Sequence, residues 1–333
     1  MPELRQNIIT GDWVVVAPER AKRPKDFVIT KGVKIAHKDN CPFCVGSDGY
    51  NANKKLIKAE TEHVYVVGNR FPAFLEDESQ KSIRSFYPEE GFYRARASVG
   101  DHEVIIIKDH DTNLLQFPKS LMCELLEVMR DRYIWIRSHE KVASIMPIYN
   151  HGAESGASID HPHAQIFASG IVSNTVGREM EGAERYFGIN GACVYCDLLK
   201  HEQKEKIRVI YQNEDFIAFN FYAPKFPFET WVMPKKHESQ FELTSKKSMQ
   251  NLSDAMSTVL HMIDKTLDNP PLNFYIHTLP TIHDDSSAYH WHIEIAPRVS
   301  RYGGFELGSD VIINTMPPEE AKMYLRNEKK DQD

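Results

Sequence analysis

The chain has 333 residues, of which 41% are hydrophobic and 26% are charged, and its formal net charge is −7. This length suits two domains of ordinary size, and the negative charge argues against nucleic acid as a partner. No apolar run reaches membrane-spanning length, and the first residues do not resemble a signal peptide. We therefore expect a cytoplasmic protein with no membrane partner.

The first predicted element is a short strand at residues 12–17, which a proline ends. Residues 20–25 then contain four cations. Most such runs are solvated loops, whereas an anion clamp would place the planar guanidinium groups of Arg20 and Arg23 on phosphate oxygens. Taken alone, the run favours the solvated loop.

Four of the five cysteines form two C-x-x-C pairs, Cys41 with Cys44 and Cys193 with Cys196. In a reducing compartment such pairs indicate metal binding or redox chemistry rather than structural disulfides. Turn-forming residues follow the first pair, where a thioredoxin-type pair needs a helix. We therefore expect a metal site that takes two ligands from the pair and two from elsewhere.

The rest of the first half combines strands with one long helix. Residues 64–67, 103–107 and 145–149 are predicted strands. Residues 119–139 form a predicted helix because their apolar side chains repeat at helical spacing. Residues 150–158 are mostly small and form a loop whose backbone N–H groups can approach a phosphate.

The most informative stretch is His161-Pro162-His163-Ala164-Gln165, which leads into a strand. Alternate residues of a strand share a face, so we expect His161, His163 and Gln165 to lie side by side. Three polar side chains make a poor core face, but a neutral imidazole is a nucleophile that needs no separate base. Two histidines in a satisfied loop are the alternative, and the period-two spacing favours catalysis.

The second half repeats this order of features. A cysteine pair, a strand ending near His237, a helix at residues 245–267, a strand at 273–276 and a strand at 289–295 follow one another. The interval from His110 to His161 is 51 residues, and that from His237 to His290 is 53. The sequence thus predicts an α+β fold of two similar units, 1–185 and 186–333. Each unit has a mostly antiparallel sheet and one packing helix.

The duplication assigns two metal sites of two cysteines and two histidines. The first is Cys41, Cys44, His110 and His161, and the second is Cys193, Cys196, His237 and His290. Four protein ligands close a zinc site and make it structural. The first zinc would therefore hold His161 and so orient His163. Buried thiols with unrelated histidines are the alternative, and this alternative has more weight for the second set.

The H-P-H-x-Q motif, the segment around Arg20 and Arg23 and the cysteine pairs resemble the galactose-1-phosphate uridylyltransferase branch of the histidine-triad superfamily. Hydrolases of that superfamily carry a third histidine where this chain has Gln165, which favours a transferase. The resemblance implies two histidine-triad-like units, a role in galactose metabolism and a ping-pong reaction. In this reaction His163 takes a uridylyl group from a UDP-sugar and passes it to a second sugar 1-phosphate.

The resemblance also implies site residues and partners. Gln165 and Ser158 would hold the phosphoryl oxygens, while Asn150 and Asn69 would belong to the substrate and nucleotide shell. Arg20 and Arg23 would reach into the site of a partner subunit, which implies a homodimer and supports the anion clamp. The substrates would be a nucleotide sugar and a sugar 1-phosphate.

Two departures leave alternatives open. Arg70 stands where the family has Asp, and the tail with Phe305 and Glu306, which we take as substrate-binding, also resembles an ADP-glucose phosphorylase branch. Phosphorolysis of an ADP-sugar is therefore a second function, and a non-catalytic zinc protein that binds nucleotides is a third. Some family members bind iron at the second site, at positions that correspond to Glu179, His277, His290 and His292.

Overall fold

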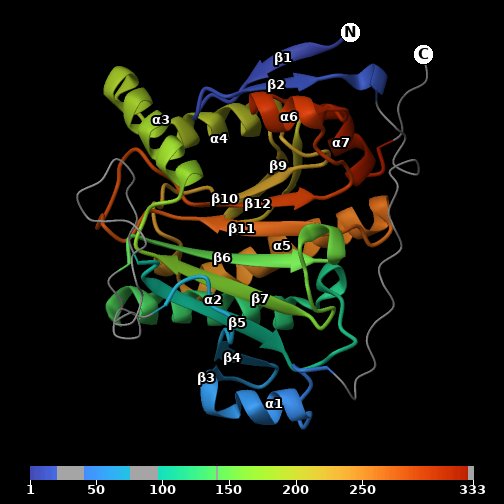
Figure 1. Ribbon diagram of the computed structural model, residues 1–333. Coiled ribbons are helices and arrows are strands. Elements are labelled where there is room, and N and C mark those ends of the chain that lie inside the picture. Colours follow the sequence, from blue (N-terminus) through green and yellow to red (C-terminus); the bar gives the residue numbers. More distant parts are fainter. Residues whose placement is uncertain (21–40, 76–96, 140–141, 329–333) are drawn as a thin grey trace.

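The computed structural model describes residues 1–20, 41–75, 97–139 and 142–328. Its main element is a ten-stranded antiparallel sheet whose two halves repeat one strand order (Figure 1). The first half runs β3 (Ile57–Glu60), β4 (Val64–Gly68), β5 (Gly100–Ile107), β7 (His163–Ser169) and β6 (Ser144–His151). The second half continues with β11 (Leu272–His277), β12 (His292–Pro297), β10 (Thr230–Pro234), β9 (Phe216–Asn220) and β8 (Val209–Gln212).

The two halves meet where β6 pairs with β11, from Tyr275 opposite Ile148 to Leu272 opposite His151. Read from the outer edge inward, β3-β4-β5-β7-β6 corresponds to β8-β9-β10-β12-β11, so the halves are related by an approximate two-fold axis. The predicted α+β fold with a duplicated antiparallel unit is confirmed.

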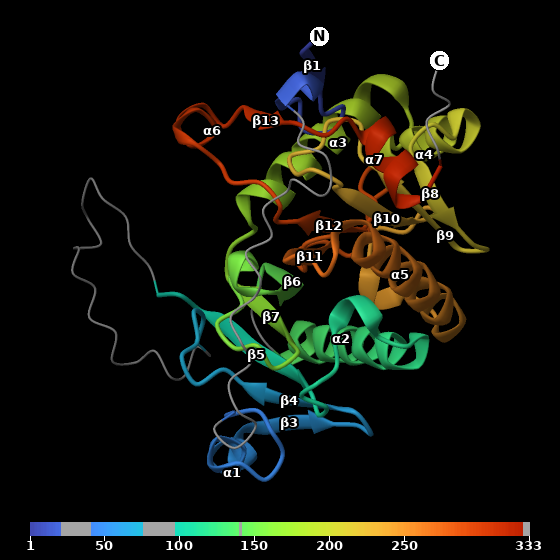
Figure 2. The ribbon, with the colours of Figure 1, turned by 90° about the vertical axis from the view of Figure 1, so that its right-hand side faces the viewer.

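One face of this sheet is covered by α2 (Lys119–His139) and α5 (Lys246–Leu267), which pack side by side (Figure 2). Both helices form where they were predicted. Their apolar side chains recur every three to four residues, which gives each helix one face that packs against the sheet. The side chain of Ser245 caps α5 by accepting the Ser248 N–H. The helices and the sheet face beneath them share one core, in which Met129 and Val259 are fully buried.

The structure contains more elements than the sheet and the one packing helix predicted for each unit. A three-stranded sheet joins β1 (Glu3–Gln6), β2 (Trp13–Val16) and β13 (Ile312–Asn314). The further helices are α1 (Asp48–Asn53), α3 (Asn174–Asn190), α4 (Val194–Glu205), α6 (Gly304–Ser309) and α7 (Pro318–Leu325). Residue 185 lies within α3, and the division into domains 1–185 and 186–333 stays a prediction.

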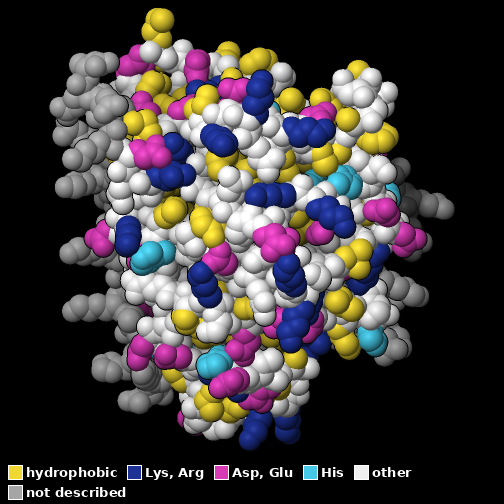
Figure 3. All heavy atoms as spheres, turned by 180° about the vertical axis from the view of Figure 1, so that it is seen from behind, with side chains coloured by type: hydrophobic (Ala, Val, Ile, Leu, Met, Phe, Trp, Pro, Cys, Tyr) yellow, Lys and Arg dark blue, Asp and Glu magenta, His cyan; other side chains and the backbone are white. Residues whose placement is uncertain are grey.

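The surface over α2 and α5 carries charges of both signs. Figure 3 shows Lys and Arg side chains interspersed with Asp and Glu on this face. Within the described residues, no helix is long and apolar enough to cross a membrane.

Candidate functional site

His163 and Gln165 lie on the face of β7 that points away from the helices. In the register with β5, His163 stands opposite Ile106 and Gln165 opposite Val104. Their neighbours Ala164 and Ile166 point the other way, into the core beneath α2. The strand begins at His163, so alternation along a strand applies to His163 and Gln165, whereas His161 lies just before it.

The imidazole of His163 is held in one tautomer. Its Nδ1–H donates to the His161 carbonyl oxygen at 2.8 Å, and this leaves the Nε2 lone pair available. Burial lowers the pKa of His163, with the hydrogen bond to His161 acting in the opposite direction. The ring is therefore neutral at pH 7, as a nucleophilic imidazole has to be.

The first set of predicted ligands comes together beside this histidine. Cys41 and Cys44 lie in the turns before α1, His110 follows β5, and His161 precedes β7. The Sγ atom of Cys44 is 3.1 Å from His110 Nδ1, and the Sγ atom of Cys41 is 3.4 Å from His161 Nδ1. All four ligand atoms lie within 4.8 Å of one another.

The tautomer of His161 fits a metal in this cluster. Its Nε2–H donates to the Ile107 carbonyl oxygen at 2.5 Å, so the Nδ1 lone pair points at the two sulfur atoms and at His110 Nδ1, 3.0 Å away. Metal-binding histidines commonly donate their second N–H to a carbonyl in this way. Two thiols and two imidazoles within bonding range of a common point suit tetrahedral zinc.

The second set repeats the arrangement in the other half. Cys193 stands at the N-cap position of α4, Cys196 lies in its first turn, His237 follows β10 and His290 precedes β12. The distances from Cys196 Sγ to the Nδ1 atoms of His237 and His290 are 3.3 and 3.8 Å.

Both imidazoles of this second set are turned toward the sulfur atoms. The Nε2–H of His237 donates to Ser286 O and that of His290 to Pro234 O, each at 3.0 Å. A hydrogen bond from Cys193 lowers the pKa of the Cys196 thiol, and the two imidazoles lower it further. Two sulfur atoms and two Nδ1 atoms gathered within 4.8 Å of one another fit a metal as well as the first set does.

A third group of potential ligands is fully buried in the second half. It comprises Glu179, His277, His292 and Glu294, whose ligand atoms lie within 4.8 Å of one another. His290 is not part of it, because its Nδ1 faces Cys196. Sequence reasoning missed Glu294, although its spacing from His292 is that of Gln165 from His163.

His292 is the counterpart of His163 in this half. Its Nδ1–H donates to the His290 carbonyl oxygen at 3.2 Å, and its buried Nε2 lies 3.4 Å from Glu294 Oε1. Burial alone would lower the pKa of His277, but the Glu179 and Glu294 carboxylates raise it to about 9. A cavity of about 310 Å³ adjoins this group.

His102 joins two of the predicted substrate residues. Its Nε2 lies 2.9 Å from Gln165 Oε1 and 3.1 Å from Asn69 Nδ2. Sequence reasoning missed this histidine because it began the strand at Glu103, whereas β5 begins at Gly100. The sequence signal that could have identified it is its place two residues before Val104, which puts both side chains on the same face of the strand.

Asn150, which the sequence placed in a loop, lies on β6 at the seam between the two halves. Asn273 on β11 stands opposite Asn150 on β6, and its amide N–H donates to Asn150 Oδ1 at 2.7 Å. This hydrogen bond leaves the Asn150 amide nitrogen free to face a ligand. Ser158 is exposed in the loop between β6 and β7.

The remaining substrate candidates lie on other elements. Arg20 ends a short 3₁₀ helix after β2 and is exposed. Phe305 and Glu306 belong to α6, where Phe305 is exposed and Glu306 accepts the Gly303 N–H at 2.9 Å. Arg23 lies outside the described residues.

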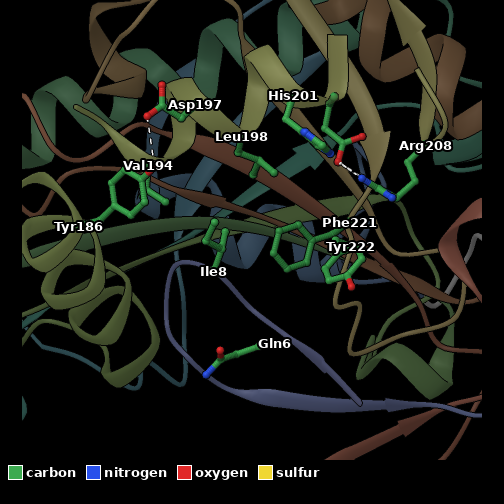
Figure 4. A pocket seen from close by; sticks show the side chains of 11 residues that line it. Gln6, Ile8, Tyr186, Val194, Asp197, Leu198, His201, Arg208, Phe221 and Tyr222 are labelled. Carbon is green, nitrogen blue, oxygen red and sulfur yellow. Dashed lines mark hydrogen bonds and ion pairs between the residues drawn. The ribbon is translucent and has the colours of Figure 1, made fainter. Parts of the chain in front are cut away.

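A larger cavity of about 600 Å³ lies between α4 and the segment after β1 (Figure 4). Leu198 and Phe221 form part of its apolar wall, and Figure 4 shows Tyr186 bonded to Asp197 at one end. Its lining includes no residue of the clusters around His163 or His292.

Comparison with known proteins matches both halves. The family model described as galactose-1-phosphate uridyl transferase, N-terminal domain, matches residues 1–173, and the model for the C-terminal domain matches residues 179–315.

Individual relatives match over nearly the whole chain. An ADP-glucose phosphorylase of Arabidopsis thaliana is 32% identical over 98% of this chain and 92% of its own length. A galactose-1-phosphate uridylyltransferase of Thermotoga maritima is 28% identical over 98% of this chain and 98% of its own length. The crystal structure of an Arabidopsis thaliana ADP-glucose phosphorylase with bound ADP-glucose superposes with a TM-score of 0.81. It is 29% identical in sequence and covers 99% of this chain and 100% of that one.

Proposed function

The chain belongs to the galactose-1-phosphate uridyl transferase family, and we propose that it transfers a nucleotidyl group from a nucleoside-diphosphate sugar to a phosphate acceptor through His163. The observation that carries this proposal is the fixed tautomer of His163, whose Nδ1–H donates to His161 O. The neutral Nε2 can therefore attack phosphorus without a separate base.

In the first step, Nε2 of His163 attacks the α-phosphorus of the nucleotide sugar. An N–P bond forms, the bond from that phosphorus to the bridging oxygen breaks, and sugar 1-phosphate leaves with the electron pair. The ring becomes cationic, and the hydrogen bond from Nδ1 to the His161 carbonyl stabilises it. In the second step, a phosphate oxygen of the acceptor attacks the same phosphorus, and His163 regains its lone pair.

Gln165 would donate a hydrogen bond from its amide to a non-bridging oxygen during both steps. An amide cannot protonate a leaving group, but phosphate leaving groups have a low pKa and do not need a general acid. Asn69, Asn150 and Ser158 would complete the contacts to the nucleotide and the phosphates; Asn69 and Ser158 lie in loops, and Asn150 lies near the end of β6.

We propose a zinc ion in each Cys₂His₂ set. Of the alternative iron ligands, Glu179, His277 and His292 lie together, whereas His290 faces Cys196 and Glu294 stands in its place. The first zinc would supply structure rather than chemistry, by holding His161 whose carbonyl orients His163. The fixed Nε2–H tautomers of His237 and His290 support zinc in the second set.

Two acceptor chemistries fit this site. A hexose 1-phosphate acceptor and a uridylyl group give hexose-1-phosphate uridylyltransferase, the activity named for the Thermotoga relative. Inorganic phosphate and an adenylyl group give ADP-sugar phosphorylase, which the 32% identity to the Arabidopsis enzyme favours. In either case a homodimer would bring Arg20 and Arg23 of one subunit to the phosphates held by the other.

The test is incubation with UDP-glucose or ADP-glucose, followed by intact mass measurement. A gain of one UMP or one AMP on the protein identifies the base and the covalent step together. The control is His163→Asn, which we expect to abolish the adduct and the turnover while leaving the fold and the metal content intact. Turnover at the wild-type rate in that variant would refute the role of His163.

A further inference from the structure

His102 lies on β5, one strand away from the nucleophile. It stands opposite Phe167 on β7, and the two rings are tilted by 30° with their centroids 4.0 Å apart. Gln165 is two residues before Phe167 on the same face, so it is the diagonal neighbour of His102. The side chain of His102 is 6% exposed, and this packing holds its ring in one plane beside the Gln165 amide.

The hydrogen bonds of His102 define its tautomer. The Ala73 backbone N–H donates to Nδ1 at 3.1 Å, so Nδ1 carries no proton. Burial lowers the pKa of His102, which leaves the ring neutral at pH 7. A neutral imidazole carries one N–H, and it must therefore be at Nε2, which donates to Gln165 Oε1 at 2.9 Å.

This hydrogen bond decides which end of the Gln165 amide faces the substrate. With Oε1 bound by His102, the NH₂ group is the end left for a phosphoryl oxygen. The reversed amide would point its carbonyl oxygen at an anionic phosphate and repel it. The Oδ1 atom of Asn69 accepts the Phe71 N–H at 2.9 Å, so its NH₂ group is the end that lies 3.1 Å from His102 Nε2. With the proton on Nε2, these two donors do not bond to each other, and the Asn69 NH₂ group is left for a ligand.

The second half shows that the fold does not require a histidine at this position. Val104 pairs with Gln165 as Trp231 pairs with Glu294, so the counterpart of His102 is Glu229. That carboxylate accepts the N–H groups of Lys225 and Phe226, which is the loop-anchoring task that His102 performs for Ala73. An N–H donor at this position is present only in the half that also carries Gln165.

We propose that His102 is a positioning residue whose Nε2–H turns the Gln165 amide so that its NH₂ group faces the phosphoryl group on His163. The proposal rests on the proposed function for the reaction that it assists. Its competitor is a purely structural role, in which His102 only anchors the loop at Ala73.

Two substitutions separate these roles, because each keeps one of the two hydrogen bonds. In His102→Asn the side-chain oxygen takes the place of Nδ1 and can accept the Ala73 N–H, but no donor reaches Gln165. In His102→Gln the amide nitrogen takes the place of Nε2 and can donate to Gln165, while the Ala73 contact is lost. A positioning role predicts slow nucleotidyl transfer in His102→Asn and fast transfer in His102→Gln. A loop-anchoring role predicts the reverse.

The measurement is single-turnover release of glucose 1-phosphate from UDP-glucose and from ADP-glucose. We expect His102→Asn to slow nucleotidyl transfer about 10- to 100-fold, less than the ~10²–10³ typical of deleting an oxyanion donor. We expect nucleotide-sugar affinity and melting temperature to stay near wild type. In a Gln165→Ala background the same substitution should have almost no further effect, since residues that act through one another are not additive.

A wild-type rate in His102→Asn, or fully additive losses in the double variant, would overturn the proposal. If the wild-type protein forms no covalent adduct with either sugar nucleotide, the proposed function fails. The hydrogen bond is then judged by the ¹⁵N shifts of the His102 ring, with His102→Asn to assign them. A proton on Nε2 supports the assigned contact, and a proton on Nδ1 refutes it whatever the activity.

Discussion

The ring edge of Phe43 packs against His163, with ring centroids 5.3 Å apart and planes at 66°. Phe43 lies between Cys41 and Cys44 in sequence, and its carbonyl oxygen accepts the Tyr65 hydroxyl at 2.6 Å. The loop that carries two of the predicted metal ligands therefore also packs against His163.

Removing this ring contact should slow transfer without removing the predicted metal ligands. We expect Phe43→Ala to lower the single-turnover rate of nucleotidyl-His163 formation and to cost about 3 kcal/mol of stability, the low end for a truncated buried aromatic. Phe43→Leu is the control, because it keeps most of the volume. An unchanged rate in Phe43→Ala with full metal content would show that the contact does not position His163.

Metal analysis tests the two ligand sets separately. We expect Cys41→Ser and His161→Asn each to lose one zinc per chain and to melt at lower temperature, because binding to a closed site stabilises the folded state. Cys193→Ser should lose the other zinc. Cys123→Ser is the matched control, because Cys123 belongs to neither set. Iron retained in Cys193→Ser would favour the alternative with Glu179, and an unchanged metal count in the first two variants would refute the first set.

Gln165 should make the covalent intermediate persist until a phosphate acceptor arrives. We expect the wild-type protein without acceptor to release about one sugar 1-phosphate per active site and then to stop, a burst typical of a covalent intermediate. Gln165→Ala should slow both formation and breakdown of the intermediate by ~10²–10³. Rapid release of free UMP or AMP without any acceptor would instead indicate a hydrolase.

A buried ion pair links the ten-stranded sheet to the helix behind it. Arg132 on α2 donates from Nε to Glu103 Oε2 at 2.8 Å, and both side chains are buried. We expect Arg132→Met to destabilise the protein by about 3–5 kcal/mol, because it leaves the Glu103 carboxylate buried without its main partner. Chemical denaturation measures the loss. The double variant Arg132→Met with Glu103→Leu should recover much of it, and equal stability of wild type and single variant would contradict the argument.

The sequence alone determined the features that depend on local pattern. Helical spacing of apolar residues placed α2 at its observed ends and α5 within one residue, because an amphipathic period is a property of neighbouring residues. The matched intervals from His110 to His161 and from His237 to His290 showed that the chain is duplicated. They also selected eight side chains that the structure gathers into two clusters.

Only the tertiary structure decided which strands lie side by side and which side chains meet across them. The pairing of β6 with β11, which joins the halves, has no local signature. The contact of His102 with Gln165 depends on the register of β5 against β7, and a shift of one residue would turn His102 to the helix face. Glu179 joins the third cluster because α3, which was not predicted from the sequence, carries it to β11 and β12. Such contacts bring together residues distant in sequence, and their geometry arises only when the sheet is complete.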